Sequence, residues 1–313
     1  MRIARFLVRR VLAAVPVVLA VVTVTFAIIH LVPGDPVQVI MGADADPQRI
    51  AEAREALGLD RPLAVQFADY LGGALTGDLG TSFFTRQPVL ELVLEKTPQT
   101  LQLAVAGIGA ALLISTPLGV LAAVRTQRRG RKAGDQTAFT MWTSILVATP
   151  DFLIGTILVY LFAVRWRWFP VAGSEGVPSI VLPAFALGLS LAGIQARVVR
   201  ASVLDSIDGP FVRTLRSAGI RERRILFRHV LRNASIPVLT LLSVEFGRLL
   251  AGALIIENIF ARPGLGTLIV DSISRRDLPA IQGEILIVAV IILVVNMAMD
   301  VQAAAIDPRV ELH

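Results

Sequence analysis

The most regular feature of the chain is the alternation of long apolar stretches with shorter polar ones. Six apolar stretches cover approximately residues 11–31, 100–124, 136–164, 179–195, 236–260 and 284–305. A helix of about 20 apolar residues is long enough to cross a hydrocarbon core of about 30 Å. Because lipid cannot satisfy open backbone groups, such stretches are expected to be helical. The pattern predicts an all-α polytopic membrane protein with six transmembrane helices.

The third apolar stretch is interrupted near its middle by Thr149-Pro150-Asp151. Proline lacks a backbone N–H and its ring collides with the preceding turn, so a kink is expected at this point. We expect each of the other five stretches to form one span.

The segment 32–99 separates the first two spans and is expected to form a small extracytoplasmic helical subdomain. Between residues 32 and 96 it holds ten acidic and five basic residues. Asp46 followed by Pro47 is a typical helix start and predicts a helix over residues 46–57. An amphipathic pattern predicts a second short helix over residues 62–71.

Basic residues lie at alternate ends of the spans and predict the orientation. Arginines precede the first span, and the segment 125–132 after the second span is strongly basic. Cytoplasmic loops carry such an excess of Lys and Arg, which places both termini inside and segment 32–99 outside. The formal net charge of +6 is therefore explained by topology and membrane lipid, and no nucleic-acid partner is expected.

The polar segment 201–235 has a pattern of its own. Within it Phe211, Leu215 and Ala218 fall at i, i+4 and i+7, one face of a short helix. Gly209-Pro210 can open this helix and Gly219 can close it. A second helical run is expected over residues 222–232. Seven arginines, at positions 213, 216, 221, 223, 224, 228 and 232, make the segment strongly basic. One interpretation is a basic loop lying on anionic lipid headgroups.

The spans and loops divide the chain into four parts. These are a cytoplasmic N-terminus with the first span (1–31), the extracytoplasmic helical segment (32–99), a core of five spans that contains the cytoplasmic loop 201–235 (100–305), and a cytoplasmic tail (306–313).

A second interpretation of the basic loop comes from a resemblance. The run Phe-Val-Arg-Thr-Leu-Arg-Ser-Ala-Gly at 211–219 resembles the cytoplasmic coupling loop of ABC-importer permeases, in particular those of the dipeptide, oligopeptide and nickel importers. Further stretches resemble motifs of the same permeases, and they occur in the same order. They are the runs 77–82, 87–89, 169–173, 257–266, 276–283 and 307–309, with Asn296 and Asp300.

The resemblance implies a function and a set of partners. The chain is identified as a permease subunit of the first-permease type, which forms half of the path of a binding-protein-dependent importer for di- or oligopeptides in a bacterial inner membrane. The implied partners are a second, similar permease, two ATP-binding subunits and an extracytoplasmic substrate-binding protein. The implied contacts to the ATP-binding subunit are Phe211, Arg213, Thr214, Leu215, Arg216, Ala218 and Gly219. Nickel and glutathione importers share these motifs and remain alternatives.

The residues that support catalysis or metal binding are scarce. The chain contains no cysteine, which excludes disulfides and thiolate metal sites. His30, His229 and His313 are far apart in the sequence, and no cofactor or metal site is expected. A membrane-embedded enzyme would need a convergent acid, base or metal set, and a stand-alone secondary transporter often shows two similar repeats. Neither feature is visible, so ATP hydrolysis is expected on another chain.

Three ionisable residues lie inside the expected spans and are candidates for the translocation path. They are Asp151 in the third span, and Glu245 and Arg248 in the fifth. A charge at mid-span costs at least roughly 2.5 to 3.5 kcal/mol on insertion scales, so its presence calls for a reason. Glu245 and Arg248 are three residues apart and can pair on one helix face. They either join helices of the bundle or contact the charged ends of a transported peptide.

Overall fold

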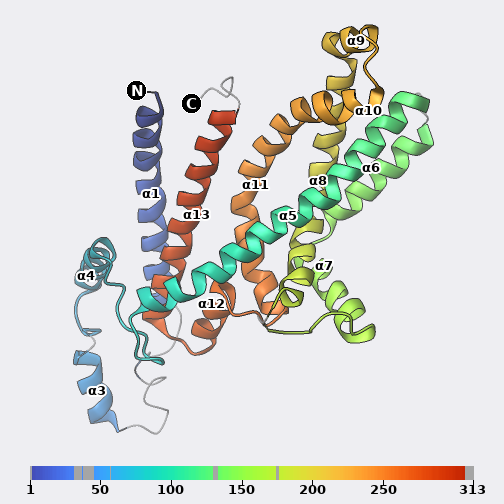
Figure 1. Cartoon of the computed structure of the whole chain (residues 1–313). Helices are drawn as coiled ribbons and strands as arrows, with labels where there is room; N and C mark the ends of the chain where they lie inside the picture. The colour runs from blue at the N-terminus through green and yellow to red at the C-terminus, as the bar shows by residue number, and fades with distance from the viewer. Residues whose placement is uncertain are drawn as a thin grey trace. The chain divides into compact units, whose positions relative to one another are not determined.

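A computed structural model describes residues 2–31, 37, 46–56, 58–129, 133–173 and 176–306, which are helical over most of their length (Figure 1). The predicted tail 306–313, with the motif Asp307-Pro308-Arg309, lies outside the described residues apart from its first residue. The chain divides into two compact units, one of residues 1–100 with 263–294, the other of 101–262 with 295–313.

The first unit contains the N-terminal helix and the short helices that follow it. Its elements are α1 (Arg2–Leu31), α3 (Pro47–Ala56), α4 (Leu63–Thr76), the start of α5 (Val89–Arg129), α12 (Leu265–Ser274) and most of α13 (Leu278–Ile306). The two predicted short helices are confirmed as α3 and α4. Phe26 of α1 packs against α4, with ring centroids 5.3 Å from Phe67 and 6.4 Å from Tyr70. The extracytoplasmic location of this part stays a prediction.

Two stretches that resemble family motifs, 77–82 and 276–283, are joined in this unit by one carboxylate. Asp277 accepts hydrogen bonds from the Ser82 hydroxyl and from the backbone N–H groups of Phe83 and Phe84, the latter two at 3.1 and 3.3 Å. The Arg275 guanidinium lies 3.7 Å from the centre of the Phe84 ring. Buried donors must find acceptors, so Asp277 fixes the turn at 82–84.

The run Gly264-Leu265-Gly266 forms the start of α12. Gly264 is extended, with φ −167°, and α12 begins at Leu265. The Thr267 hydroxyl accepts a hydrogen bond from the Gly264 N–H at 3.0 Å, and the Thr100 hydroxyl accepts one from the Leu265 N–H at 2.9 Å. These side chains satisfy N–H groups that a helix start leaves open, so the chain continues as a helix.

The second unit is built around α8. Its elements are the rest of α5, α6 (Ala133–Ala148), α7 (Asp151–Leu158), the π-helix η1 (Val159–Arg165), α8 (Pro178–Asp208), α9 (Pro210–Ser217), α10 (Glu222–Arg224), the π-helix η2 (Ile225–Val230) and α11 (Leu231–Ile259). Glycines let neighbouring helices approach α8. A Cβ on Gly188 would lie 2.6 Å from the Ala110 Cβ, and one on Gly193 would lie 2.7 Å from the Thr143 carbonyl oxygen. Small residues at helix contacts are typical of membrane bundles.

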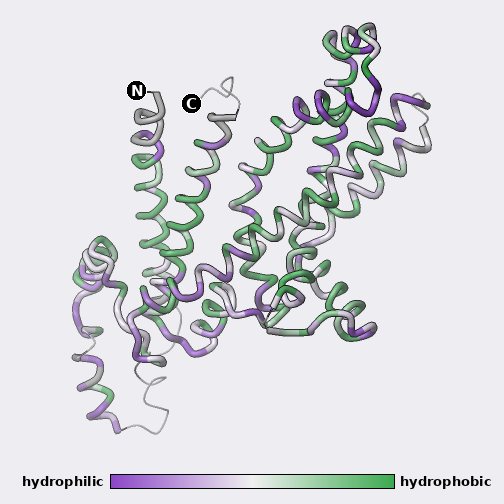
Figure 2. The backbone as a smooth tube through the Cα atoms, in the orientation of Figure 1, coloured by the Kyte–Doolittle hydropathy of each residue, from purple (hydrophilic) through white to green (hydrophobic). Residues whose placement is uncertain are grey.

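Among the described residues, five long apolar helices and one broken pair have the length and composition of the six predicted spans. The five lie in α1, α5, α8, α11 and α13, and the pair 136–148 with 151–165 is bent by 97°. The predicted kink is therefore a break. Pro150 takes an extended conformation, with ψ 144°, and a new helix begins at Asp151. Figure 2 shows the apolar character of the long helices and the hydrophilic residues between α8 and α11.

Candidate functional site

The predicted short helix of the basic loop is α9, and both of its ends are fixed. Gly209 is extended, with φ −63° and ψ 149°, and Pro210 occupies the first turn. At the other end Gly219 has φ +72°. The Gly219 N–H donates to the Arg216 carbonyl at 3.0 Å and the Ile220 N–H to the Leu215 carbonyl at 3.1 Å. These two bonds form a Schellman motif. The predicted opening and closing residues are confirmed.

The predicted face of α9 is covered in part by the protein itself. Val212 is fully buried, and Phe211 and Leu215 pack against a cluster of buried side chains from α5, α8, η2 and α11. Phe211 and Leu215 remain partly exposed and Ala218 is exposed. The contact of these three side chains with an ATP-binding subunit stays a prediction. The exposed residues of the predicted set are Arg213, Thr214, Arg216, Ala218 and Gly219.

The expected helical run over residues 222–232 is divided into α10, η2 and the first residues of α11. In the π-helix η2 the chain forms wider turns, a feature that frequently occurs at functional sites. Arg224, Arg228 and Arg232 are all exposed. The segment therefore presents its arginines outward while Ile225 and Val230 enter the buried cluster.

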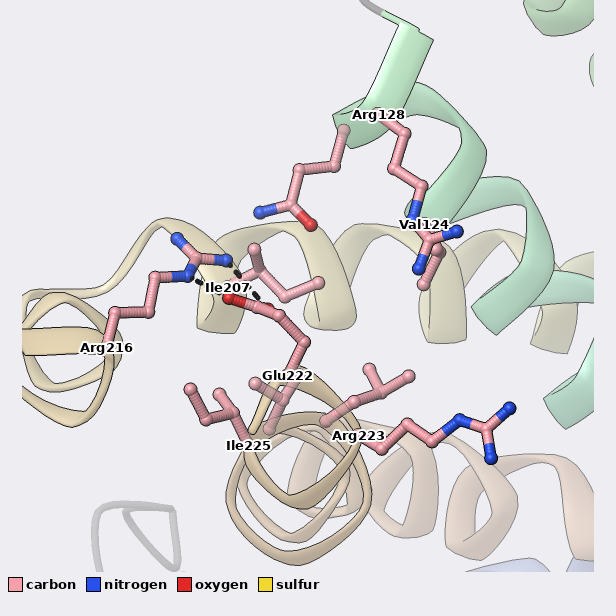
Figure 3. Close-up of a pocket in the computed structure, with 10 residues that line it drawn as sticks. Val124, Arg128, Ile207, Arg216, Glu222, Arg223 and Ile225 are labelled. Atoms are coloured by element: carbon pink, nitrogen blue, oxygen red, sulfur yellow. Dashed lines mark hydrogen bonds and ion pairs between the residues drawn. The ribbon is translucent and has the colours of Figure 1, made fainter. Parts of the chain in front are cut away.

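An ion pair joins α9 to α10 beside a shallow pocket (Figure 3). Arg216 Nε lies 2.7 Å from Glu222 Oε1, and Arg216 Nη2 lies 3.3 Å from Oε2. Hydrogen bonding to Glu222 raises the pKa of Arg216 above its ordinary value. Both groups are exposed, so their pairing orients the two helices more than it stabilises the fold.

The pocket beside this ion pair has a volume of about 300 Å³ and lies between the end of α5 and the α9–α10 segment. Val124 and Arg128 of α5, Ile207 of α8 and Arg223 of α10 line it with the ion pair (Figure 3). The loop is thus packed against α5 and α8, the two long helices that end beside it.

The candidate path residues lie close to one face of α11. Glu245 Oε2 and Arg248 Nε are 2.6 Å apart, which confirms the predicted pairing. Glu245 is largely buried and Arg248 is 56% exposed. Gly252 follows on the same face, since i, i+3 and i+7 lie together on a helix. A Cβ on Gly252 would lie 2.9 Å from Asp151 Oδ2. The Asp151 carboxylate therefore lies over this face about one turn, or roughly 6 Å, beyond Arg248.

Two further polar residues in the second unit were missed by the sequence reasoning. Gln195 of α8 is fully buried and donates from Nε2 to the Val238 carbonyl at 3.0 Å, while its Oε1 has no hydrogen-bond partner among the described residues. Arg262, after α11, is buried and donates to Gln102 Oε1 at 2.9 Å. Burial lowers the pKa of Arg262, and the charge of Glu257 opposes that shift. Gln195 is the last residue of the predicted span 179–195, and a polar residue at the end of a span carries no special signal.

In the part of the chain that the structure describes, no group of three or more His, Cys, Asp or Glu side chains is placed to hold a metal ion.

Sequence comparison assigns nearly the whole chain to one kind of protein. Residues 115–312 match the family described as the binding-protein-dependent transport system inner membrane component, and residues 3–104 match the N-terminal part of such membrane components. The chain belongs to this family. It is a multi-pass permease of a binding-protein-dependent ABC importer, as the motifs of the basic loop and the last two spans indicated.

Curated relatives match the permease over almost its full length. The glutathione transport system permease protein GsiC of Salmonella choleraesuis (strain SC-B67) is 38% identical over 305 residues, which cover 97% of this chain and 98% of the relative. The protein of the same name from Escherichia coli (strain K12) is 36% identical over 305 residues.

Solved structures show the same fold at low identity. Two inward-facing crystal forms of the MetNI methionine ABC transporter contain a chain that is 16% identical to the permease. Their TM-scores are 0.55 and 0.57, and the matches cover 70% and 69% of the permease and 97% and 96% of the solved chains.

Proposed function

We propose that the permease forms one half of the translocation path for di- and oligopeptides, including peptide-like compounds such as glutathione. Family membership supports import, and the full-length relatives carry the name of a glutathione transport system. The observation that carries the proposal is that three charged side chains lie along one face of α11. Glu245 and Arg248 belong to α11, and Asp151 reaches this face from α7. A peptide carries a carboxylate and an ammonium group, and this face offers a charge of each sign.

The second part of the proposal concerns coupling. The exposed side of α9, with Arg213, Thr214 and Ala218, contacts an ATP-binding subunit. Its inward side transmits the motion, because Phe211 and Leu215 pack against side chains of the long helices. A short helix fixed at both ends moves as a body. ATP hydrolysis on two partner subunits then drives the permease pair between outward-open and inward-open states.

The orientation follows from the same proposal. Both termini and α9 lie in the cytoplasm, and α3 and α4 lie outside, where the substrate-binding protein delivers its ligand. The acidic balance of residues 32–96 and the basic balance of 201–235 support this arrangement. A second, similar permease completes the path.

The test is uptake by the whole importer in vesicles, with labelled dipeptide, glutathione and Ni²⁺ offered separately. We expect uptake of a peptide or of glutathione that requires both ATP and the loaded binding protein. Uptake of Ni²⁺ alone would establish the nickel alternative. Uptake driven by an ion gradient without ATP would indicate a secondary transporter and refute the proposal.

A further inference from the structure

A second pocket lies between α5, α6 and α8, away from the candidate coupling loop. Its volume is about 220 Å³. Five of its residues fall on one face of α5, three come from α6 and one from α8. They are Leu118, Leu121, Ala122, Arg125, Thr126, Ala138, Phe139, Trp142 and Arg200. One end of this lining is basic and the other is apolar.

The basic end holds two arginines, Arg125 and Arg200. Arg200 lies over the Phe139 ring, 5.4 Å from its centre, and donates to the Thr126 hydroxyl at 3.3 Å. Arg125 lies one residue before Thr126. In the described part of the chain, no acidic side chain forms an ion pair with either arginine. Two guanidinium groups that line one pocket can bind an anion together, and their geometry matches that of phosphate.

The apolar end points along the spans. On α5, Leu118 lies seven residues before Arg125, or about 10 Å deeper along the helix. Leu121 and Trp142 are 52% and 45% exposed, and Ile145, one turn further along α6 from Trp142, is 54% exposed. An apolar surface therefore continues from the arginines toward the centre of the spans, and it is long enough to contact an acyl chain.

We propose that this pocket binds an anionic phospholipid, with the phosphate between Arg125 and Arg200 and an acyl chain along Leu118, Leu121 and Trp142. Basic pockets between spans on the cytoplasmic side are suited to such headgroups. Free phosphate would satisfy the arginines but would leave the apolar surface unused, and the charge of the pocket disfavours a zwitterionic lipid. In this proposal the pocket binds neither the transported substrate nor ATP.

The lipid is detected through Trp142, which lines the pocket. The chain has three tryptophans, so Trp166→Phe and Trp168→Phe leave Trp142 as the sole tryptophan of the full chain, and its fluorescence is excited selectively. The chain is reconstituted in bilayers that contain brominated phosphatidylglycerol in unlabelled phosphatidylcholine, or the converse. A juxtamembrane arginine raises the local concentration of anionic lipid about fivefold. We therefore expect the fraction of phosphatidylglycerol in contact with Trp142, measured by the quenching, to be at least roughly five times its fraction in the bilayer.

Variants separate a specific site from general attraction to the surface. Arg125→Gln with Arg200→Gln should bring quenching down to the bulk share, Arg200→Lys should keep most of the preference, and the matched control Arg232→Gln, an exposed arginine of α11, should leave it unchanged. Loss in the control as well would indicate only a diffuse basic surface and overturn the proposal. Equal quenching by both brominated lipids would do the same, and abolition by inorganic phosphate would identify free phosphate as the ligand.

Discussion

The Schellman motif that ends α9 gives a sharp test of coupling. Gly219 has φ +72°, and a Cβ built there meets no atom within 4 Å. A side chain at this position is therefore opposed by backbone conformation alone and not by a collision. For an ordinary L-residue the left-handed conformation costs about 1–2 kcal/mol, and asparagine is one of the residues that adopt it routinely.

The comparison is Gly219→Val against the matched control Gly219→Asn, which is of similar size. Valine is expected to weaken the bonds from the Gly219 and Ile220 N–H groups to Arg216 and Leu215. A cost of about 1–2 kcal/mol raises the population with a loosened helix end roughly 5- to 30-fold. α9 would then deform where it should move as a body, and ATP hydrolysis would lose its link to the spans.

The assay is ATP hydrolysis by the reconstituted importer with and without loaded binding protein, beside uptake in the same vesicles. Gly219→Val should reduce uptake several-fold and should lower hydrolysis or make it independent of the binding protein. Gly219→Asn should behave nearly as the unchanged protein, and both variants should reach the membrane in equal amounts. Normal, stimulated hydrolysis and normal uptake by Gly219→Val would refute the reasoning and leave the loop as a basic membrane-surface segment.

Three other predictions concern the ion pair of α11, the orientation of the chain and the hydrogen bonds of Asp277. Arg248→Ala should impair uptake with assembly intact, whereas full uptake by a Glu245→Leu/Arg248→Leu double variant would show that the pair serves only to join helices. A cysteine at Glu52 should react with an impermeant thiol reagent in intact cells and one at Ser217 should not; the reverse labelling would invert the topology. Asp277→Ala leaves three donors without their acceptor, at about 1–3 kcal/mol for each buried one, and should lower the melting midpoint of the purified complex by several degrees; an unchanged midpoint would contradict that role.

Local signals predicted the parts of the fold that local physics decides. Length and hydropathy located the spans, Pro47 marked the start of α3, and Gly209-Pro210 and Gly219 marked the ends of α9. Pro150 was predicted to kink the third span, but the angle of the bend was not predictable. Whether a freed turn bends slightly or breaks by 97° depends on the helices packed around it.

Contacts between segments far apart in the chain could not be predicted from the sequence. The apolar face of α9 was visible as a pattern, yet Phe211 and Leu215 turned out to pack against the protein's own helices. The hydrogen bonds of Asp277 to the turn at 82–84 join residues almost two hundred positions apart. The pairing of Glu245 with Arg248 was predictable because three residues along one helix fix the geometry.

The contacts of α9 and of α11 define a physical route between the candidate coupling site and the candidate path. Val212 of α9 is buried in the cluster that contains Val199 of α8 and Val238 of α11. At that level Gln195 of α8 donates to the Val238 carbonyl, so α8 and α11 are joined by a hydrogen bond as well as by packing.

From Val238 the helix α11 continues for two turns to Glu245 and Arg248, and one further turn brings it under the Asp151 carboxylate. A close-packed interior passes displacement along such contacts because it cannot absorb strain by compression. A rigid shift of α9 would therefore displace Val238 first. It would then rotate or translate the face of α11 that carries Glu245 and Arg248. Since Asp151 belongs to α7 and the pair belongs to α11, that displacement changes the distance between the charges on the two helices, which is what a site that must bind and then release a charged peptide requires.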